Sequence, residues 1–336
     1  MHRVSSRRGA FVSIAILLAL ISISFTLGAA HVDNVWNVLL HPMRHSDQSG
    51  HDIIWNIRFP RIVAALLIGA TLGAAGVMAQ GACNNPLAEP SILGTSAGAA
   101  TGVLLGVLVG AVSIGSFGAV VCGALGGFLA TMLTFTLASR RSSASSMTLV
   151  IVGIAVSAML AAVVGVATSI ASRADARSLS FWNFGSMALV TNKDLIALAV
   201  SVVAGLIIAA RIAPSLDVLS LGDDSARHRG FDSRIIRFVA LGALSLLVGA
   251  SVSTVGSIAF VGLAAPHIAR FLYGPTNRTV LFHGALIGAA IVLAADTAAR
   301  TVASPNELPI GLLTSLIGAP VLIALVSTRS SVWKIS

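Results

Sequence analysis

The sequence predicts an all-α membrane protein with about ten spanning helices. Asp, Glu, Lys and Arg make up 10% of its 336 residues and hydrophobic residues make up 56%, whereas about a quarter of an average soluble domain is charged. The stretch 90–139 contains none of these four charged residue types. Because one helix needs about 20 apolar residues to cross a hydrocarbon core about 30 Å thick, this stretch alone holds two spans, with a turn at Val112–Gly115.

The other uncharged windows place all ten spans in a single membrane domain, residues 1–336. The expected spans are 11–30, 61–82, 92–111, 115–138, 147–171, 194–211, 233–252, 257–273, 279–299 and 308–328. The first window follows Arg3, Arg7 and Arg8 and resembles a signal peptide, but its apolar run is longer than that of most such peptides, so we expect a retained helix. The stretch 251–262 is crowded with Ser, Thr and Gly, and we expect it to be partly non-helical.

The basic residues predict how the chain is oriented in a cell membrane. Ten spans put both termini on one side. That side carries Arg3, Arg7, Arg8, Arg140, Arg141, Arg227, Arg229, Arg234, Arg278, Arg329 and Lys334, and the opposite side carries Arg44, Arg58, Arg61, Arg173, Arg177, Lys193 and Arg300. The side richer in Lys and Arg is expected to be cytoplasmic. The net charge of +9 thus reflects topology and does not indicate a nucleic-acid partner.

Glycines repeat at intervals of four residues in two of the expected spans. Gly69 and Gly73 lie in the second span, and Gly98, Gly102, Gly106 and Gly110 lie in the third. This spacing lines small residues along one helix face, so a neighbouring backbone can approach closely. The face could line a pore or a dimer seam, or it could pack within the bundle, which is the interpretation we favour.

The spans lack the residues that an ion-coupled carrier or an ATPase needs. Every acidic residue falls in a loop or near a span end, whereas ion-coupled carriers usually keep ionisable residues near the bilayer centre. A phosphate-binding loop needs Lys after Gly, but the two lysines follow Asn192 and Trp333. The energy for any active process must therefore come from a partner protein, or the process uses no energy source. Cys83 and Cys122 lack the spacing of a metal site or a disulfide framework and are interpreted as packing residues.

One expected cytoplasmic connection, residues 212–232, is longer than a turn requires. We expect a short helix with Leu216, Val218 and Leu219 on its apolar face, followed by an interruption at Gly222. Asp223 or Asp224 can cap a second short helix, which Gly230 ends. Two amphipathic helices in a corner suit docking into a groove on another protein, although they could instead lie on the membrane interface.

Several distinctive motifs follow one another along the chain. In the first half these are RFPR at 58–61 leading into IVAALLIGATLGAAGVMAQ, then NPLAEP at 85–90 and SILGTSAGAATG. In the second half they are VLSLGDDSARHRG, VGSIAFVGLAAPHIARFLYG, AADTAAR and ELPIGLLTSLIGAPVLIALV. In this order they resemble the FecCD-type permeases of binding-protein-dependent ABC importers for iron-siderophores, haem and cobalamin, and the resemblance covers the chain from Arg58 to its end.

The resemblance implies a type II ABC importer permease fold with ten helices per subunit. Two subunits, either two copies of this chain or this chain with a paralogue, would surround the pathway. Two cytoplasmic ATPases would hold the ATP and Mg²⁺, so that this chain binds no cofactor and is not itself an enzyme, and an extracytoplasmic binding protein would deliver the ligand. The coupling residues would be Leu216, Leu219, Leu221, Gly222, Asp223, Asp224, Ala226 and Gly230.

The resemblance also suggests roles at both membrane surfaces. Arg58, Arg61 and Arg300 would receive carboxylates of the binding protein, although they could instead anchor in the headgroups, and Arg300 could pair with Asp296 four residues earlier. A cytoplasmic gate would comprise Asn85, Pro86, Leu87, Ser145 and Ser146. Pro fixes the backbone and Leu can exclude water, but a purely structural turn is an open alternative.

The Pro-His pair Pro266–His267 matches the family without indicating a metal site. A lone His lacks the clustered donors that a metal requires, so no residue is assigned as a ligand.

An ion-coupled secondary transporter and an integral-membrane enzyme are the functional classes that compete with an ABC importer permease. Within the importer class the cargo could be cobalamin or haem, and an iron(III)-siderophore is favoured because that branch of the family is the broadest.

Overall fold

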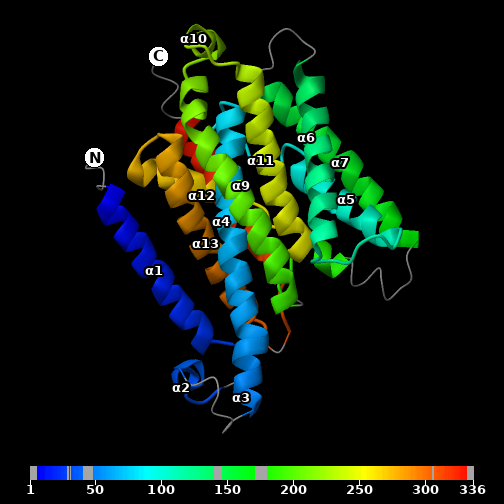
Figure 1. Cartoon of the computed structure of the whole chain (residues 1–336), viewed down its shortest axis with the longest axis vertical. Helices are drawn as coiled ribbons and strands as arrows, with labels where there is room; N and C mark the ends of the chain where they lie inside the picture. Colours follow the sequence, from blue (N-terminus) through cyan, green and yellow to red (C-terminus); the bar gives the residue numbers. More distant parts are fainter. Residues whose placement is uncertain are drawn as a thin grey trace.

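The computed structural model is a bundle of helices (Figure 1). The described residues are 6–28, 30, 32–40, 48–139, 146–170, 180–188, 190–304 and 306–330. No strand occurs among them, which agrees with the expected all-α class.

Seven helices within the described residues are long and apolar enough to cross a membrane. They are α1 (Ser6–Thr26), α4 (Phe59–Ala82), α6 (Phe117–Ser139), α7 (Ser146–Ile170), α9 (Asn192–Leu219), α11 (Ser233–Val255) and α13 (Asn277–Ala299). Each coincides with an expected span. The chain is therefore a multi-pass membrane protein.

The other three expected spans also coincide with helices, but two of these are short. The α5 helix (Thr95–Leu108) has 14 residues and α12 (Val261–Tyr273) has 13, so each is about 20 Å long and too short to cross the hydrocarbon core. The third is α14 (Ile310–Ser330). The expected non-helical stretch is real but narrower than 251–262, because α11 continues to Val255 and only residues 256–260 lack helix.

Short elements mark the two ends of the bundle (Figure 1). At one end α2 (Val35–Leu40) lies beside α3 (Gln48–Asp52), which runs through the π-helical segment η1 (Ile53–Arg58) directly into α4. At the other end lies α10 (Asp223–His228). We call these the α2 end and the α10 end.

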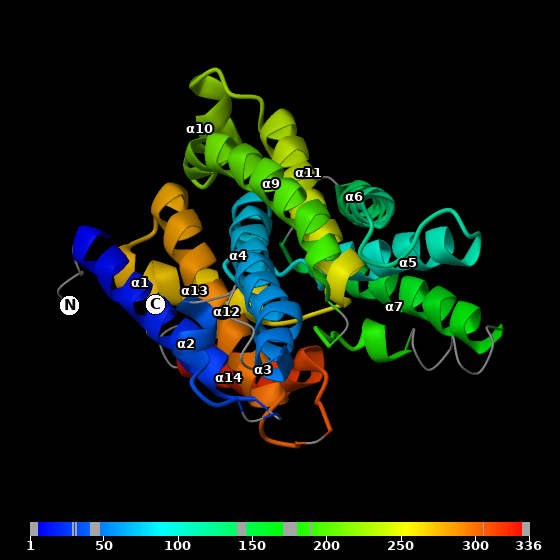
Figure 2. The same cartoon turned by 60° about the horizontal axis from the view of Figure 1, so that its bottom comes forward.

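The centre of the bundle is α4, which packs against α13, α11, α9 and α12 (Figure 2). A Cβ atom at Gly69 would lie 2.3 Å from the carbonyl oxygen of Gly288, and one at Gly73 would lie 2.2 Å from that of Gly284. Only hydrogen atoms fit at these points, so the backbones of α4 and α13 touch.

The glycines of α5 serve the same purpose against α6. A Cβ at Gly98 would lie 2.4 Å from the Cβ of Ala130 and 2.5 Å from the carbonyl oxygen of Gly126, and one at Gly102 would lie 2.3 Å from the carbonyl oxygen of Cys122. Packing within the bundle, the favoured interpretation of this glycine pattern, is therefore confirmed for Gly98 and Gly102. Gly110 differs, because it lies in the turn after α5 with φ +71° and has open space around it.

Candidate functional site

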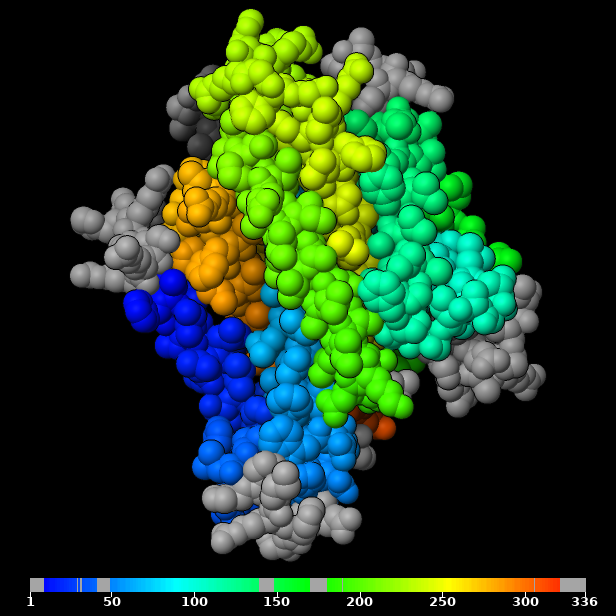
Figure 3. All heavy atoms as spheres, in the orientation of Figure 1, coloured from blue at the N-terminus to red at the C-terminus, as the bar shows by residue number. Residues whose placement is uncertain are grey.

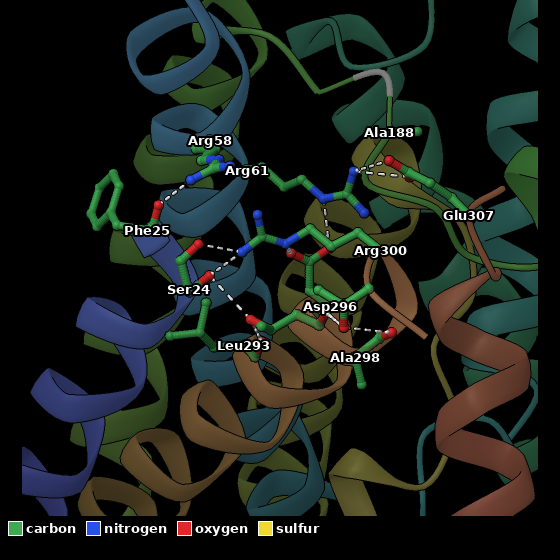
Figure 4. Close-up of polar contacts among 12 residues, drawn as sticks. Ser24, Phe25, Arg58, Arg61, Ala188, Leu293, Asp296, Ala298, Arg300 and Glu307 are labelled. Atoms are coloured by element: carbon green, nitrogen blue, oxygen red, sulfur yellow. Dashed lines mark hydrogen bonds and ion pairs between the residues drawn. The ribbon is translucent and has the colours of Figure 1, made fainter. Parts of the chain in front are cut away.

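At the α2 end, three arginines from different parts of the chain meet two carboxylates (Figure 4). Arg61, in the first turn of α4, donates from Nε to Asp296 Oδ1 at 2.7 Å. Its Nη1 donates to both carboxylate oxygens of Glu307, at 2.8 and 2.9 Å. Arg61 therefore ties α4 to the end of α13 and to the segment before α14.

The other two arginines of this cluster bind the C-terminal end of α1. Arg300 Nη2 donates to the carbonyl and the hydroxyl oxygen of Ser24, at 2.5 and 2.6 Å, and its Nε lies 3.5 Å from Asp296 Oδ2. Arg58 donates to the carbonyl oxygens of Phe25 and Ala30. The last carbonyls of a helix have no partner within it, so the arginines stabilise the end of α1.

We call Arg58, Arg61, Asp296, Arg300 and Glu307 the arginine cluster. Its three arginines are only 3–5% exposed and Asp296 is fully buried, whereas the Glu307 side chain is 31% exposed. Burial lowers the pKa of Arg300 to about 10, although Asp296 opposes this shift, so its guanidinium is ionised at pH 7. By formal charge, the cluster has one more basic than acidic side chain.

The three expected docking residues, Arg58, Arg61 and Arg300, thus lie close together, but they are buried within this chain. Their guanidinium groups face carbonyls and carboxylates of the same molecule (Figure 4), and the alternative ion pair between Arg300 and Asp296 is confirmed. Docking of a second protein on these arginines stays a prediction. Sequence reasoning missed Ser24 and Glu307, because hydropathy contains no information on which distant segments meet.

The expected gate lies in the segment that follows α4 at the α10 end. The backbone N–H of Leu87 donates to Asn85 Oδ1 at 2.9 Å, which closes a tight turn around Pro86. Asn84, just before it, has φ +46°. Ser146 begins α7, and Ser145 lies outside the described residues. The structure thus contains the turn that both interpretations require, the cytoplasmic gate and the purely structural turn.

Glu89, two residues after this turn, is buried. Sequence reasoning treated it only as a loop residue. Its carboxylate accepts a hydrogen bond from the backbone N–H of Phe260, directly before α12, where Phe260 has φ +67°. Burial raises the pKa of Glu89, and this hydrogen bond opposes the shift. Glu89 therefore joins the segment after α4 to the start of the short helix α12.

The expected coupling loop differs from its prediction in two respects. The span does not end at residue 211, because α9 continues through Pro214 to Leu219, and the apolar residues Leu216 and Leu219 belong to its last turns. Neither Asp223 nor Asp224 caps α10, whose N-cap is Gly222 with φ +100°. The interruption at Gly222 and the end near Gly230, which has φ +79°, are confirmed.

The coupling residues divide into buried and exposed ones. Leu216, Leu219 and Ala226 are at most 1% exposed and pack inside this chain, so they position the loop and present no side chain to a partner. Leu221 is 57% exposed at the junction between α9 and α10. Asp224 is also exposed and lies 3.9 Å from Arg227.

Arg237, one turn into α11, links α10 to the end of α4. Its Nη2 donates to Asp223 Oδ1 at 2.7 Å and its Nη1 to Oδ2 at 3.2 Å. Its Nε donates to the carbonyl of Ala82, the last residue of α4, at 3.1 Å. A single side chain thus bridges the exposed short helix and the segment that leads to Pro86. Sequence reasoning missed Arg237, although a charged residue inside the expected span 233–252 indicates a polar contact within the bundle.

A second set of polar contacts joins the neighbouring helix ends. Asp217 of α9 accepts from the backbone and side-chain nitrogens of Asn277, at 2.7 and 2.9 Å. Arg270 of α12 donates to Asn277 Oδ1 at 3.1 Å and to Gln80 Oε1 of α4 at 3.3 Å. Together with Arg237, these contacts connect the ends of five helices beneath α10.

No group of three or more His, Cys, Asp or Glu residues that could hold a metal ion occurs within the described parts of the chain. His267 and Pro266 lie within α12, where Pro266 is buried. Cys83 and Cys122 are not joined in a disulfide, and both are partly buried. Cys83 packs against the apolar core, and the side chain of Cys122 on α6 lies against Gly106 of α5.

Comparison with known proteins gives concordant matches over nearly the whole chain. The profile of the FecCD transport family matches residues 14–328. The chain is 38% identical to the iron(3+)-hydroxamate import system permease protein FhuB of Bacillus subtilis, over 89% of this chain and 77% of that protein. It is 36% identical to the hemin transport system permease protein HmuU of Yersinia pestis, over 81% and 83% of the two chains.

A vitamin B12 permease and a solved structure complete the comparison. The chain is 35% identical to the vitamin B12 import system permease protein BtuC of Escherichia coli, over 84% of this chain and 86% of that protein. A structure described as an inward-facing conformation of a metal-chelate type ABC transporter superposes with a TM-score of 0.80 and 30% identity, over 95% and 98% of the two chains.

Replacing Asp296 with Asn should destabilise the chain by about 3–5 kcal/mol, because it leaves buried Arg61 and Arg300 without their shared counter-ion. The measurement is thermal unfolding of the purified protein in detergent. Asp224→Asn is the matched control, since that side chain is 91% exposed, and it should unfold as the unaltered protein does. Equal stability of both variants would show that the cluster does not hold the α2 end together.

Proposed function

The chain belongs to the FecCD transport family, and we propose on that premise that it is the permease subunit of an ATP-driven, binding-protein-dependent importer whose cargo is an iron(III)-siderophore. The family match over residues 14–328 carries this proposal. Three relatives named for hydroxamate, hemin and vitamin B12 import lie within a few per cent of one another in identity. Haem and cobalamin are accordingly the alternative cargoes.

The chain's own structure supports a passive role in energy conversion. Its charged network beneath α10 connects helix ends, and its sequence lacks a Lys after Gly for a phosphate-binding loop. ATP and Mg²⁺ would therefore be bound by two partner ATPases in the cytoplasm, and this chain would bind no cofactor. A second permease subunit, either a copy of this chain or a paralogue, would complete the pathway, with both termini in the cytoplasm.

The exposed part of α10 is proposed as the contact with the ATPase. Leu221, at the junction that leads into α10, presents an apolar side chain, and Asp223 in the first turn of α10 pairs with Arg237. Movement of α10 would be transmitted through Arg237 to Ala82, the last residue of α4. The next residues, Asn85, Pro86 and Leu87, would then open or close the cytoplasmic exit, together with Ser145 and Ser146.

The α2 end is proposed as the contact with the delivery protein. Because the three arginines of the cluster are buried, a carboxylate of the partner must displace an internal one to reach them. Glu307 is the partly exposed member of the cluster, and it accepts two hydrogen bonds from Arg61. We propose that a partner carboxylate takes the place of Glu307 on Arg61, with Arg58 and Arg300 supplying further positive potential.

The transport function is tested with the full chain and the ATPase and delivery protein that co-purify with it. Proteoliposomes should take up a ferric trihydroxamate only when ATP reaches the ATPase and the delivery protein is present. Uptake driven by an ion gradient without the ATPase would instead indicate a secondary transporter. If the delivery protein retained haem or cobalamin, and not the ferric hydroxamate, the importer class would stand and the siderophore proposal would fail.

Two variants should separate docking from transmission at α10. Leu221→Asp places a charge in the proposed apolar contact and should prevent the ATPase from co-purifying. Arg237→Gln should leave the ATPase bound but lower import about tenfold or more, because it removes charge-assisted hydrogen bonds worth about 1.5–3 kcal/mol. Arg234→Gln, an exposed arginine on the same helix, is the control and should transport normally. Normal import by Arg237→Gln would disprove this route of transmission.

Glu307→Gln should raise the association rate of the delivery protein, because the competing carboxylate on Arg61 loses its charge. Asp52→Asn removes an exposed negative charge from the same end of the molecule, where the Asp52 side chain is 59% exposed, and it controls for general electrostatic steering. Surface plasmon resonance at low and at physiological salt gives both rates. A rate for Glu307→Gln no higher than that for Asp52→Asn would contradict exchange at Arg61.

A further inference from the structure

An apolar groove of about 830 Å³ runs between α1 and α9 on the surface of the bundle (Figure 3). Its floor is formed by α4 and α13, with Leu66 and Ala70 from α4 and Ala285 from α13. One wall comes from α1 through Leu17 and the other from α9 through Leu206 and Ala210. The transport proposal uses none of these residues.

The groove has the length of one membrane leaflet. On α13 its lining extends from Arg278 to Ala289, a rise of about 16 Å along the helix axis. A hydrocarbon core about 30 Å thick gives each leaflet about 15 Å. An acyl chain lying in the groove would therefore remain within a single leaflet.

Two arginines close the groove at the α10 end. Arg278 is the second residue of α13, and Arg211 of α9 follows Ala210 directly. Arg211 comes about 28 Å after the start of α9, which is nearly the thickness of a hydrocarbon core, and Arg278 lies in the first turn of α13. Both side chains are exposed, and neither forms an ion pair with an acidic side chain of the described residues.

This combination of shape and charge selects one kind of occupant. The apolar walls match an acyl chain. Two arginines that pair with no carboxylate of the described residues match a phosphate, which Arg binds with two parallel hydrogen bonds. Basic pockets between membrane helices on the cytoplasmic side bind anionic lipid headgroups. The α10 end carries the larger number of basic residues and is therefore the expected cytoplasmic end.

We propose that this groove is a binding site for an anionic phospholipid of the cytoplasmic leaflet, with the phosphate on Arg211 and Arg278 and one acyl chain between α1 and α9. The bound chain would fill the space that separates α1 from α9 and so fasten α1 to the bundle. The proposal requires a membrane-spanning chain with its α10 end in the cytoplasm, and it is independent of the identity of the cargo.

The test is native mass spectrometry of the full-length protein released from detergent with phosphatidylglycerol or phosphatidylcholine of identical acyl chains. The unaltered protein should retain phosphatidylglycerol roughly 30-fold better, since each arginine near an anionic lipid contributes roughly a factor of five. The double variant Arg211→Gln, Arg278→Gln should retain both lipids equally. The matched control, Arg229→Gln with Arg234→Gln, removes two exposed arginines from the same end and should keep the preference.

A second pair of variants tests the apolar part of the groove. Ala210→Phe should fill it and lower the retention of both lipids, whereas Ala204→Phe, at an exposed position of α9 outside the groove, should have no effect. Equal retention of the two lipids by the unaltered protein, or a preference that survives in the Arg211/Arg278 variant, would overturn the proposal. So would a loss of dimer in place of a loss of lipid in Ala210→Phe, because the groove would then be a contact between copies.

Discussion

The contact between the backbones of α4 and α13 is the constraint on which the other features depend. Lipid tails are as apolar as leucine, so helices in a membrane associate by close packing, with little hydrophobic driving force between them. The glycine pairs at Gly69 with Gly288 and Gly73 with Gly284 bring the two helices together without intervening side chains. This contact fixes the position of α4 along and around α13, and α4 carries functional residues at both of its ends.

Because α4 is held along its length, its two ends act as parts of one rigid body. Arg61 in its first turn enters the arginine cluster, and Gln80 and Ala82 in its last turn enter the polar network beneath α10. The short helix α12 lies beside it, and α12 starts at a backbone break where Phe260 donates a hydrogen bond to Glu89. Glu89 thereby joins the segment after α4 to a helix that begins where the backbone leaves helical conformation.

Hydropathy and turn residues predicted where helices would occur, and the glycine spacing predicted that they would pack closely. They placed 61–82 within two residues of α4 and 279–299 within two residues of α13. Periodicity could not predict that α9 would pass through Pro214 or that α5 and α12 would be short, because tertiary contacts decide those ends. Nor could it show that Arg61 would meet Asp296 and Glu307, since this depends on how distant segments assemble.

The residues of the arginine cluster and their partners are synthesised at different times. Arg58 takes its carbonyl partners from the end of α1, made 28 to 33 residues earlier, so these are present when α4 emerges. Asp296 is made 235 residues after Arg61, a delay of roughly 10–50 s at typical rates of translation. The α2 end of the bundle therefore obtains its ion pairs in two stages, and the second requires almost the whole polypeptide.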